Sequence, residues 1–181
     1  MALPLFRRRP QANTIRALYG AIVAQARAPA FYADFGVPDT VEGRFDMVVL
    51  HLALLIRRLR SEPEDLRAVG QQVFDAFCTD MDHNLREMGI SDTGLPRRMR
   101  QFGEAFYGRV TTYDRALDQS GEADIAAALA RNVYRRADAE PLHAARLAYY
   151  VRTAERQLAG QPASEMAAGS VRFPAVEGQE Q

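Results

Sequence analysis

Residues 80-DMDHN-84 place oxygen-bearing side chains at alternate positions, the spacing that a calcium-binding loop uses for its ligands at positions 1, 3 and 5. Such a loop also needs a glycine at position 6 and a bidentate glutamate at position 12, where this sequence has Leu85 and Ser91. Apolar residues recur at helical spacing straight through the segment. The pattern therefore predicts a helix with a polar, acidic edge and not a calcium site.

The residues that bind transition metals or act as nucleophiles also lack the sequence spacing that such sites require. The histidines are His51, His83 and His143, and no pair has the i, i+4 spacing of a helical zinc site. His51 lies within an apolar run, where a hydrogen-bonded core histidine is expected, and Cys78 is expected to act as a small buried hydrophobe. The sequence contains no phosphate loop, nucleophile motif or paired-cysteine motif. We predict no metal site, no cofactor and no enzymatic activity.

One enzymatic alternative stays open. Helical isoprenoid synthases hold magnesium and a diphosphate with aspartate-rich helices, and Asp75, Asp80 and Asp82 lie close together in this sequence. Asp75 and Asp80 are five residues apart, which puts them on different faces of a helix. The sequence has no second aspartate cluster to oppose the first. The match to an Asp-rich, magnesium-dependent diphosphate enzyme is therefore poor.

The elements that must position these side chains are helices. Apolar periodicity predicts helices over 12–33, 41–60, 61–88, 95–118, 122–137 and 141–159. The second of these is apolar on nearly every side, so it is expected to be central and buried. Ser61 and Glu64 have the spacing of a capping box at the start of the third helix, and Gly89 is expected to end it. The sequence predicts an all-α fold, a single compact bundle of about six helices.

Length and composition limit the classes to which this protein can belong. We divide the 181 residues into a flexible N-terminus (1–11), a helical domain (12–160) and a disordered tail (161–181), because the tail shows no apolar period. The formal net charge is zero, which argues against a nucleic-acid binder. The longest apolar run, 47–56, is about half as long as a membrane-spanning helix. Residues 1–10 lack the apolar run of a secretory signal, so a cytoplasmic protein is expected.

The order of four segments resembles a known family. They are 15-IRALYGAIVAQARAPAFYADFGVPD-39, 45-FDMVVLHLALLIRRLR-60, 70-GQQVFDAFCTDMDHNLREMGI-90 and 106-FYGRVTTYDRAL-117. They contain a histidine within an apolar helix that ends in arginines, then the element F-x-x-D-M-D-x-N-L-R-E-M-G, then Y-D-x-A-L. Over about residues 12–160 the chain is similar to the ubiquinol–cytochrome c chaperone family.

The resemblance implies a helical, non-enzymatic protein that assists the assembly of cytochrome b into the ubiquinol–cytochrome c reductase complex. A bacterial member would act in the cytoplasm, with peripheral contact at the inner membrane. Its partner would be cytochrome b or another subunit of the respiratory complex. A helical adaptor that binds a different membrane or regulatory protein is the alternative from another class.

A chaperone for such a client needs an apolar groove between helices, with charged residues along its rim. Arg57, Arg58 and Arg60 are the first candidates for this rim. They end the apolar helix, where cations also favour the helix dipole, so a structural role accounts for them equally well. In the functional interpretation they face anionic lipid or acidic client loops, together with Arg7–Arg9.

The acidic element around residue 80 is the second candidate. It consists of Asp75, Asp80, Asp82 and Arg86, which the resemblance would place against the client. Asp82 and Arg86 have the i, i+4 spacing of a helical ion pair, so the same residues also fit a purely structural role. Tyr113 and Asp114 are expected to fix the fourth helix against its neighbours.

Overall fold

The computed structural model of the protein describes residues 12–135 and 141–176. Its elements are α1 (Ala12–Ala26), α2 (Pro29–Ala33), α3 (Val41–Arg60), α4 (Glu64–Glu87), α5 (Leu95–Leu117), α6 (Ala123–Leu129), the π-helical turn η1 (Ala130–Tyr134), α7 (Pro141–Gly160) and α8 (Ala163–Ala167). Within these ranges there are helices and no strand, which confirms the all-α prediction.

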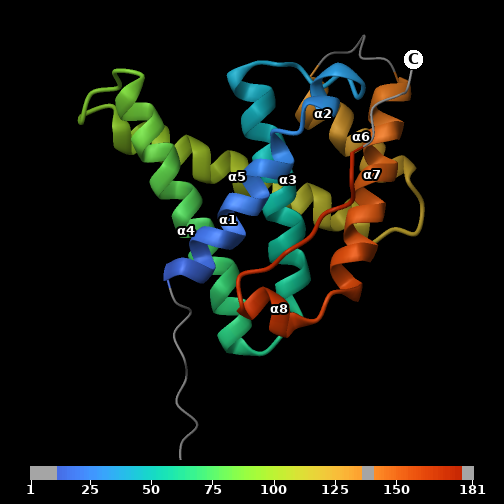
Figure 1. The fold of residues 1–181 in the computed structure, drawn as a ribbon. Helices are drawn as coiled ribbons and strands as arrows, with labels where there is room; N and C mark the ends of the chain where they lie inside the picture. Colours follow the sequence, from blue (N-terminus) through green and yellow to red (C-terminus); the bar gives the residue numbers. More distant parts are fainter. Residues whose placement is uncertain (1–11, 136–140, 177–181) are drawn as a thin grey trace, which may run out of the picture.

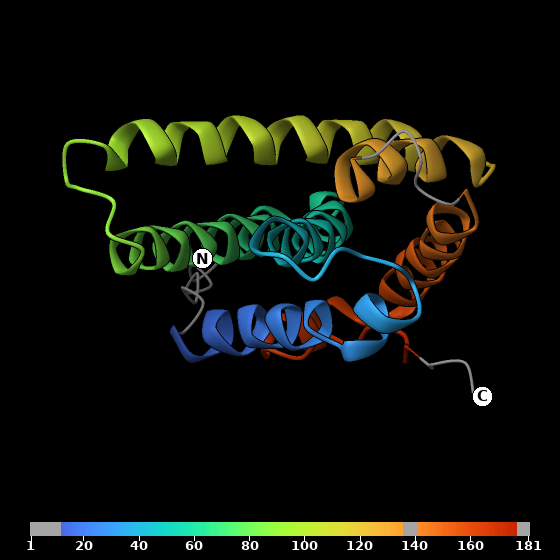
Figure 2. The same ribbon diagram turned by 90° about the horizontal axis from the view of Figure 1, so that it is seen from above.

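The long helices are arranged in layers, which Figure 2 shows from above. α5 lies on one side, α3 and α4 form the middle, and α1 lies on the other side, while α7 crosses near one end. α3 contacts α1, α4, α5 and α7, so it is the central helix of the bundle (Figure 1). In the described ranges, no helix combines the length and the hydropathy that crossing a bilayer requires.

The start of α3 depends on a cap and on a close backbone approach. The side chain of Thr40 accepts a hydrogen bond of 3.1 Å from the backbone N–H of Gly43. A Cβ atom at Gly43 would lie 1.9 Å from the carbonyl oxygen of Pro38, so only glycine fits there. Beyond this point Leu50, Leu52 and Leu55 are completely buried. Burial of each such side chain stabilises the fold by about 1.5–3 kcal/mol, which explains why this apolar helix is central.

The two ends of α4 test the predicted capping signals. Gly89 has φ of +82°, and its N–H donates to the carbonyl of Arg86, while the N–H of Ile90 donates to the carbonyl of Leu85. This pair of bonds is a Schellman motif, so the predicted stop at Gly89 is confirmed. The capping box predicted at Ser61 is wrong. Ser61 caps the C-terminal end of α3, and Pro63 precedes α4 without a side-chain cap.

Several predicted boundaries differ from the structure. The helix expected over 122–137 consists of α6 and the π-helical turn η1, and the chain leaves helical geometry at Arg135. The helix expected over 12–33 is divided into α1 and α2, because the ring of Pro29 disfavours helical backbone at Ala28, whose ψ is 124°. The disorder predicted for 161–181 is wrong as far as residue 176. α8 forms there, and Met166 and Val171 are buried. The predicted flexible N-terminus (1–11) and the last five residues lie outside the described ranges.

Single anchoring contacts hold the segment after α8, which is why no periodicity revealed it. The side-chain amide of Gln161 makes two hydrogen bonds to the backbone of Arg172. It accepts one from the N–H at 2.9 Å and donates one to the carbonyl oxygen at 2.6 Å. The ring of Phe173 packs edge-on against His51 with ring centres 5.0 Å apart. An isolated contact of this kind leaves no repeat in the sequence.

A chain of hydrogen bonds crosses the core beneath this segment. Gln25 donates to the hydroxyl of Tyr150 at 3.0 Å, and that hydroxyl lies 2.8 Å from Nε2 of His51. Nδ1 of His51 lies 2.7 Å from the carbonyl oxygen of Met47, which only accepts, so the proton of the neutral ring is on Nδ1. His51 is therefore the hydrogen-bonded core histidine that the sequence predicted.

The burial of His51 predicts a pH-dependent stability. Burial lowers the pKa of His51 to about 4, against an ordinary value of 6.5, and the bond to Met47 opposes that change only in part. The stability from the neutral ring is complete above pH 6.5 and is lost as the pH falls towards 4. This pKa difference corresponds to about 3 kcal/mol in the free energy of unfolding.

We expect His51→Gln to remove this pH dependence. Asp46, whose pKa is raised to about 6, acts with the opposite sign over nearly the same range, so the quantity to compare is the difference between the two proteins. Urea unfolding at several pH values between 4 and 7 measures it. Parallel curves for the wild type and His51→Gln would contradict the prediction.

Candidate functional site

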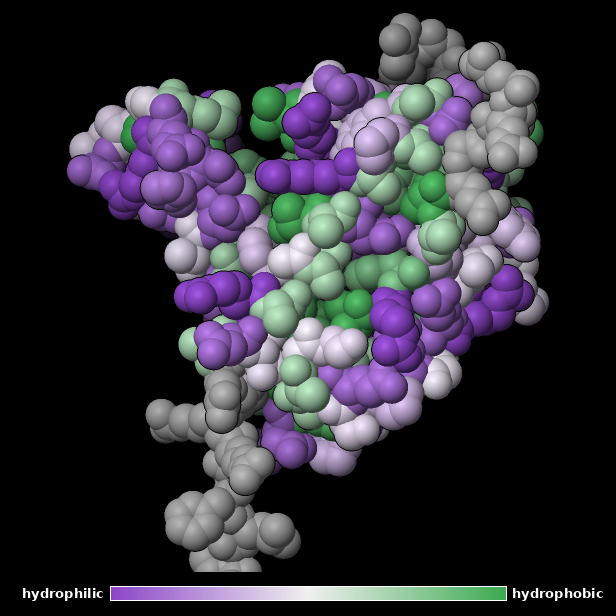
Figure 3. Space-filling model, in the orientation of Figure 1, coloured by the Kyte–Doolittle hydropathy of each residue, from purple (hydrophilic) through white to green (hydrophobic). Residues whose placement is uncertain are grey.

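An open groove of about 750 Å³ lies between the C-terminal half of α4, the start of α5, the N-terminal half of α3 and one face of α1. Figure 3 shows the surface hollowed between the tip of the α4–α5 hairpin and the beginning of α3. The hairpin tip projects beyond the remaining helices in Figure 1. The groove therefore has one side formed by a projecting hairpin and a floor formed by the central helix.

Apolar side chains dominate the interior of the groove. They include Val23, Phe45, Met81, Leu85, Met88 and Phe102. At the opening, Val41 is 66% exposed and Met88 is 65% exposed, which is unusual for large apolar residues. Exposed apolar surface around a concavity is typical of an interaction site, and methionine side chains adapt to differently shaped apolar partners.

Charged residues of both signs stand around this apolar interior. Asp80 is one of them, and its carboxylate accepts a hydrogen bond of 2.8 Å from the hydroxyl of Tyr19. Burial, and then the bond to Asp80, raises the pKa of Tyr19, so the hydroxyl stays protonated and donates. This bond joins α1 to α4 along one side of the groove. Arg27 and Arg98 lie elsewhere on the lining.

A buried carboxylate lies beneath the inner end of the groove. Asp46 is fully buried, with Oδ1 2.9 Å from Nη2 of Arg109 and Oδ2 2.7 Å from Nη2 of Arg135. Burial raises the pKa of Asp46 to about 6, although both arginines act to lower it. At pH 7 the carboxylate is ionised. Arg109 and Arg135 themselves line the groove.

Unusual backbone places Arg135 over this carboxylate. The helix formed by α6 continues as the π-helical turn η1 and ends at Arg135, which has φ of +53°. Non-glycine residues seldom adopt this left-handed conformation, and π-helical turns occur often at functional sites. The N–H of Arg135 donates to the carbonyl of Ala130 at 3.0 Å, which fixes the turn.

Our sequence interpretation missed Asp46, Arg109 and Arg135. One signal for Asp46 was present, because it lies between Phe45 and Met47 in a helix that is apolar on nearly every side. An aspartate at such a position must be paired when the helix is buried. Its partners come from α5 and η1, and nothing in the local sequence pattern identifies them.

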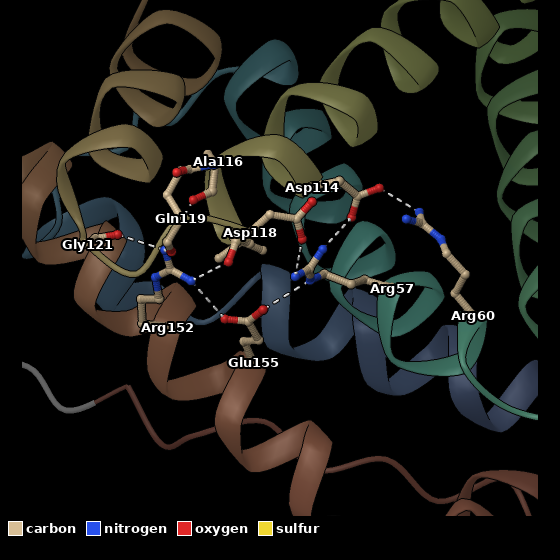
Figure 4. A network of polar contacts seen from close by, with 10 residues as sticks. Arg57, Arg60, Asp114, Ala116, Asp118, Gln119, Gly121, Arg152 and Glu155 are labelled. Atoms are coloured by element: carbon tan, nitrogen blue, oxygen red, sulfur yellow. Dashed lines mark hydrogen bonds and ion pairs between the residues drawn. The ribbon is translucent and has the colours of Figure 1, made fainter.

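Arg57 and Arg60, two of the arginines that were predicted to bind a partner, form intramolecular ion pairs (Figure 4). Arg57 contacts Asp114 at 3.3 Å, Asp118 at 2.8 Å and Glu155 at 3.0 Å, which joins α3 to α5 and α7. Arg60 also contacts Asp114, at 2.5 Å. These contacts confirm that Asp114 fixes the fourth predicted helix, now α5.

Arg58 also makes an ion pair and hydrogen bonds within the protein. It pairs with Glu62 and donates to the carbonyl oxygens of Leu158 at 2.9 Å and Gln161 at 3.1 Å. The contacts of Arg57, Arg58 and Arg60 thus account for all three as connections between α3 and the rest of the bundle. A role in binding a partner stays a prediction for them.

Most of the acidic element lies on the surface outside the groove. Asp75 accepts from Gln71 at 2.9 Å, and Arg86 pairs with Asp82 at 2.8 Å and with Asp92. Of the seven residues predicted to bind a partner, Asp80 alone lines the groove. The structure therefore places the predicted residues on different surfaces.

The contrast between Arg57 and Arg86 predicts different effects on stability. The side chain of Arg57 is 23% exposed and pairs with three carboxylates, so Arg57→Met is expected to lower the free energy of unfolding by about 2 kcal/mol. Arg86 is a surface residue whose ion pairs are hydrated, so Arg86→Met is expected to change stability very little. Urea unfolding measures both variants, and equal losses would show that the Arg57 network contributes no more than surface pairs.

The groove suits the binding of an apolar segment with polar or charged ends. Its interior supplies apolar surface, and charged side chains of both signs stand around it. Among the described residues, no three side chains of His, Cys, Asp or Glu come together in a way that could hold a metal ion.

Comparisons with known proteins point to one family. The family model described as "Ubiquinol-cytochrome C chaperone" matches residues 33–173. Ubiquinol-cytochrome-c reductase complex assembly factor 1 from Xenopus laevis is 26% identical over 135 residues, which are 75% of this chain and 67% of that protein. The Homo sapiens protein of the same name is 25% identical over 135 residues, which cover 45% of its length.

A solved structure has the same fold. The crystal structure of the Cbp3 homolog from Brucella abortus matches with a TM-score of 0.85 and 40% sequence identity, over 97% of this chain and 98% of that one. The chain spans less than half the length of the human relative, but nearly the whole of the crystallised Brucella chain. The family model covers most of the described residues, including α3, α4 and α5. This chain belongs to the ubiquinol–cytochrome c chaperone family.

Proposed function

We propose that this protein is an assembly chaperone that binds newly made cytochrome b and supports biogenesis of the ubiquinol–cytochrome c reductase complex. Membership in the family supports the assembly role. The observation that carries the binding role is the apolar groove beside the α4–α5 hairpin, with Val41 and Met88 exposed at its opening. Cytochrome b is a hydrophobic membrane protein, so its segments need apolar cover before assembly.

The groove would hold a helical segment of the client by its apolar face. A helix in a groove contacts it through side chains at i, i+3, i+4 and i+7, and Phe45, Met81 and Phe102 offer surface to such a row. Charged residues around the groove would help to set the orientation of the segment. The action is stoichiometric: the chaperone binds the client, keeps it competent for assembly and releases it to partner subunits.

We place the protein in the cytoplasm with peripheral contact at the inner membrane, since the client enters the membrane there. Asp80, which lines the groove, is the acidic residue that we expect to face the client. Arg57, Arg58 and Arg60 would contribute to partner binding through the outer surface of their ion-pair network. The cluster Arg7–Arg9, predicted to face anionic lipid or acidic client loops, lies outside the described residues.

A deletion strain tests the proposed function. The reduced-minus-oxidised spectrum of its membranes should lose the b-type signal, ubiquinol–cytochrome c reductase activity should fall, and both should return when the gene is restored. Affinity-tagged protein should carry cytochrome b after crosslinking in the cell. Normal cytochrome b in the deletion strain, together with a different crosslinked protein, would support an adaptor for another client. Magnesium-dependent diphosphate binding in calorimetry would instead support the enzyme alternative.

A further inference from the structure

We propose that the inner end of the groove, where Arg109 and Arg135 meet above Asp46, is a binding site for a carboxylate carried by the client segment. The inference rests on the proposed function, because it concerns the segment that the groove holds. It adds a chemical requirement: the segment is apolar along one face and has an aspartate or glutamate at one end.

The charges at this point do not balance. Arg109 and Arg135 carry two positive charges, and within the described part of the chain Asp46 is the one carboxylate that pairs with either of them. Among the described residues, the cluster of Asp46, Arg109 and Arg135 therefore carries a surplus of one positive charge. This surplus would attract a carboxylate of the client and repel a lysine or arginine.

Donor groups of the arginines also remain for a ligand. Arg109 donates from Nη1 to the carbonyl of Ala105 at 3.2 Å, and its Nη2 lies 2.9 Å from Oδ1 of Asp46 as an ion pair. Among the described residues, Nε of Arg109 and Oδ1 of Asp46 are both buried without a hydrogen-bond partner. Arg135 uses Nη2 for Asp46 and Nε for the carbonyl of Asn132 at 3.3 Å. A guanidinium has five N–H donors in a planar fork that fits a carboxylate in bidentate geometry.

The two guanidinium groups are held in place before any ligand binds. The guanidinium of Arg109 lies 5.7 Å from the ring centre of Phe45, within the range of a cation–π contact, and Asp46 holds it from below. Arg135 is fixed by the π-helical turn and its left-handed backbone. Backbone strain of this kind is found where the surrounding structure maintains a functional geometry. A preorganised donor pair loses little entropy on binding an anion.

The neighbouring surface indicates that the carboxylate belongs to a polypeptide segment. Phe102 and Ala105 precede Arg109 on the same face of α5, and all three line the groove. An apolar helix lying along Phe102 would bring the side chain at its end to Arg109 and Arg135. Burial of its apolar face and pairing of its carboxylate would then stabilise the same bound position.

Designed peptides test this site directly. The probe is a fluorescent helical peptide of about 18 residues, or about five turns, with leucine along one face and one glutamate in its first or last turn. Matched peptides carry glutamine or lysine in place of that glutamate. We expect one of the two glutamate peptides to bind the wild-type protein about tenfold more tightly than its glutamine match, and the lysine peptide to bind more weakly still. Fluorescence anisotropy measures the affinities.

Protein variants test whether the arginines cause the preference for the glutamate peptide. Arg135→Gln should bind the glutamate and glutamine peptides equally, whereas Arg156→Gln, an exposed arginine on α7 outside the groove, should keep the tenfold preference. If Arg135→Gln does not fold, Arg135→Lys keeps the pairing with Asp46 but loses the planar fork, and it should keep only part of the preference.

The outcomes distinguish the proposed carboxylate site from the proposed apolar docking groove. Equal binding of glutamate and glutamine peptides to the wild type would overturn the carboxylate site and leave the groove as an apolar docking site. A preference that persists in Arg135→Gln would overturn the assignment to these arginines. Failure of all the peptides to bind would overturn both the site and the groove, while the assembly role would still be decided by the deletion strain.

Discussion

Asp46→Ala is expected to lower the free energy of unfolding by about 3 kcal/mol at pH 7, because it leaves the guanidinium of Arg109 without its counter-charge. The side chain of Arg109 is only 14% exposed, whereas that of Arg135 is 42% exposed and regains water more easily. Most of the loss should therefore arise at Arg109. Urea unfolding followed by circular dichroism measures the effect.

Two matched variants make this result specific to the buried carboxylate. Asp46→Asn keeps the size of the side chain and one acceptor oxygen, so it should give a loss intermediate between the wild type and Asp46→Ala. Asp39→Ala removes an exposed carboxylate 2.7 Å from Arg44 and should leave stability nearly unchanged. If Asp46→Ala were no more destabilising than Asp39→Ala, the buried pair would contribute nothing to the fold.

Met88→Glu is expected to abolish most of the chaperone activity without unfolding the protein. The side chain of Met88 is largely exposed in the free protein, so a charge there has little effect on the fold. In the proposed complex the same side chain is covered by the client, and loss of about 1.5–3 kcal/mol of apolar burial corresponds to about a tenfold to hundredfold weaker affinity. The measurement is the amount of crosslinked cytochrome b, together with the b-type spectrum of the complemented deletion strain.

Leu142→Glu is the matched control for this prediction. Leu142 is 69% exposed, close to the 65% of Met88, but it lies on α7 and does not line the groove. The same change from an apolar to an acidic side chain should leave cytochrome b levels normal there. Equal defects in both variants, with both proteins folded, would show that the groove is not the client-binding surface.

The sequence by itself determined the helices and the identity of the central one. The 3.6-residue apolar period is a local property, and α3, α4 and α5 lie where that period predicts them. The apolar surface of α3 on nearly every side required burial, which explains why His51 could be assigned to the core. Gly89 likewise carried its own signal, because a helix stop with positive φ favours glycine. The local pattern failed where single contacts decide, as at α8.

Only the tertiary structure decided which charges meet and where apolar surface stays open. Arg57 and Glu155 are 98 positions apart in the chain, and Asp46 and Arg135 are 89 apart, so no spacing rule relates them. The arginines at the end of α3 fitted either an ion-pair network or a partner-binding rim, because both roles require the same residue type in the same place. The groove arises because the α4–α5 hairpin extends beyond the helices that cover the rest of α3. Its shape depends on how far packed helices reach past one another, and local periodicity does not contain that information.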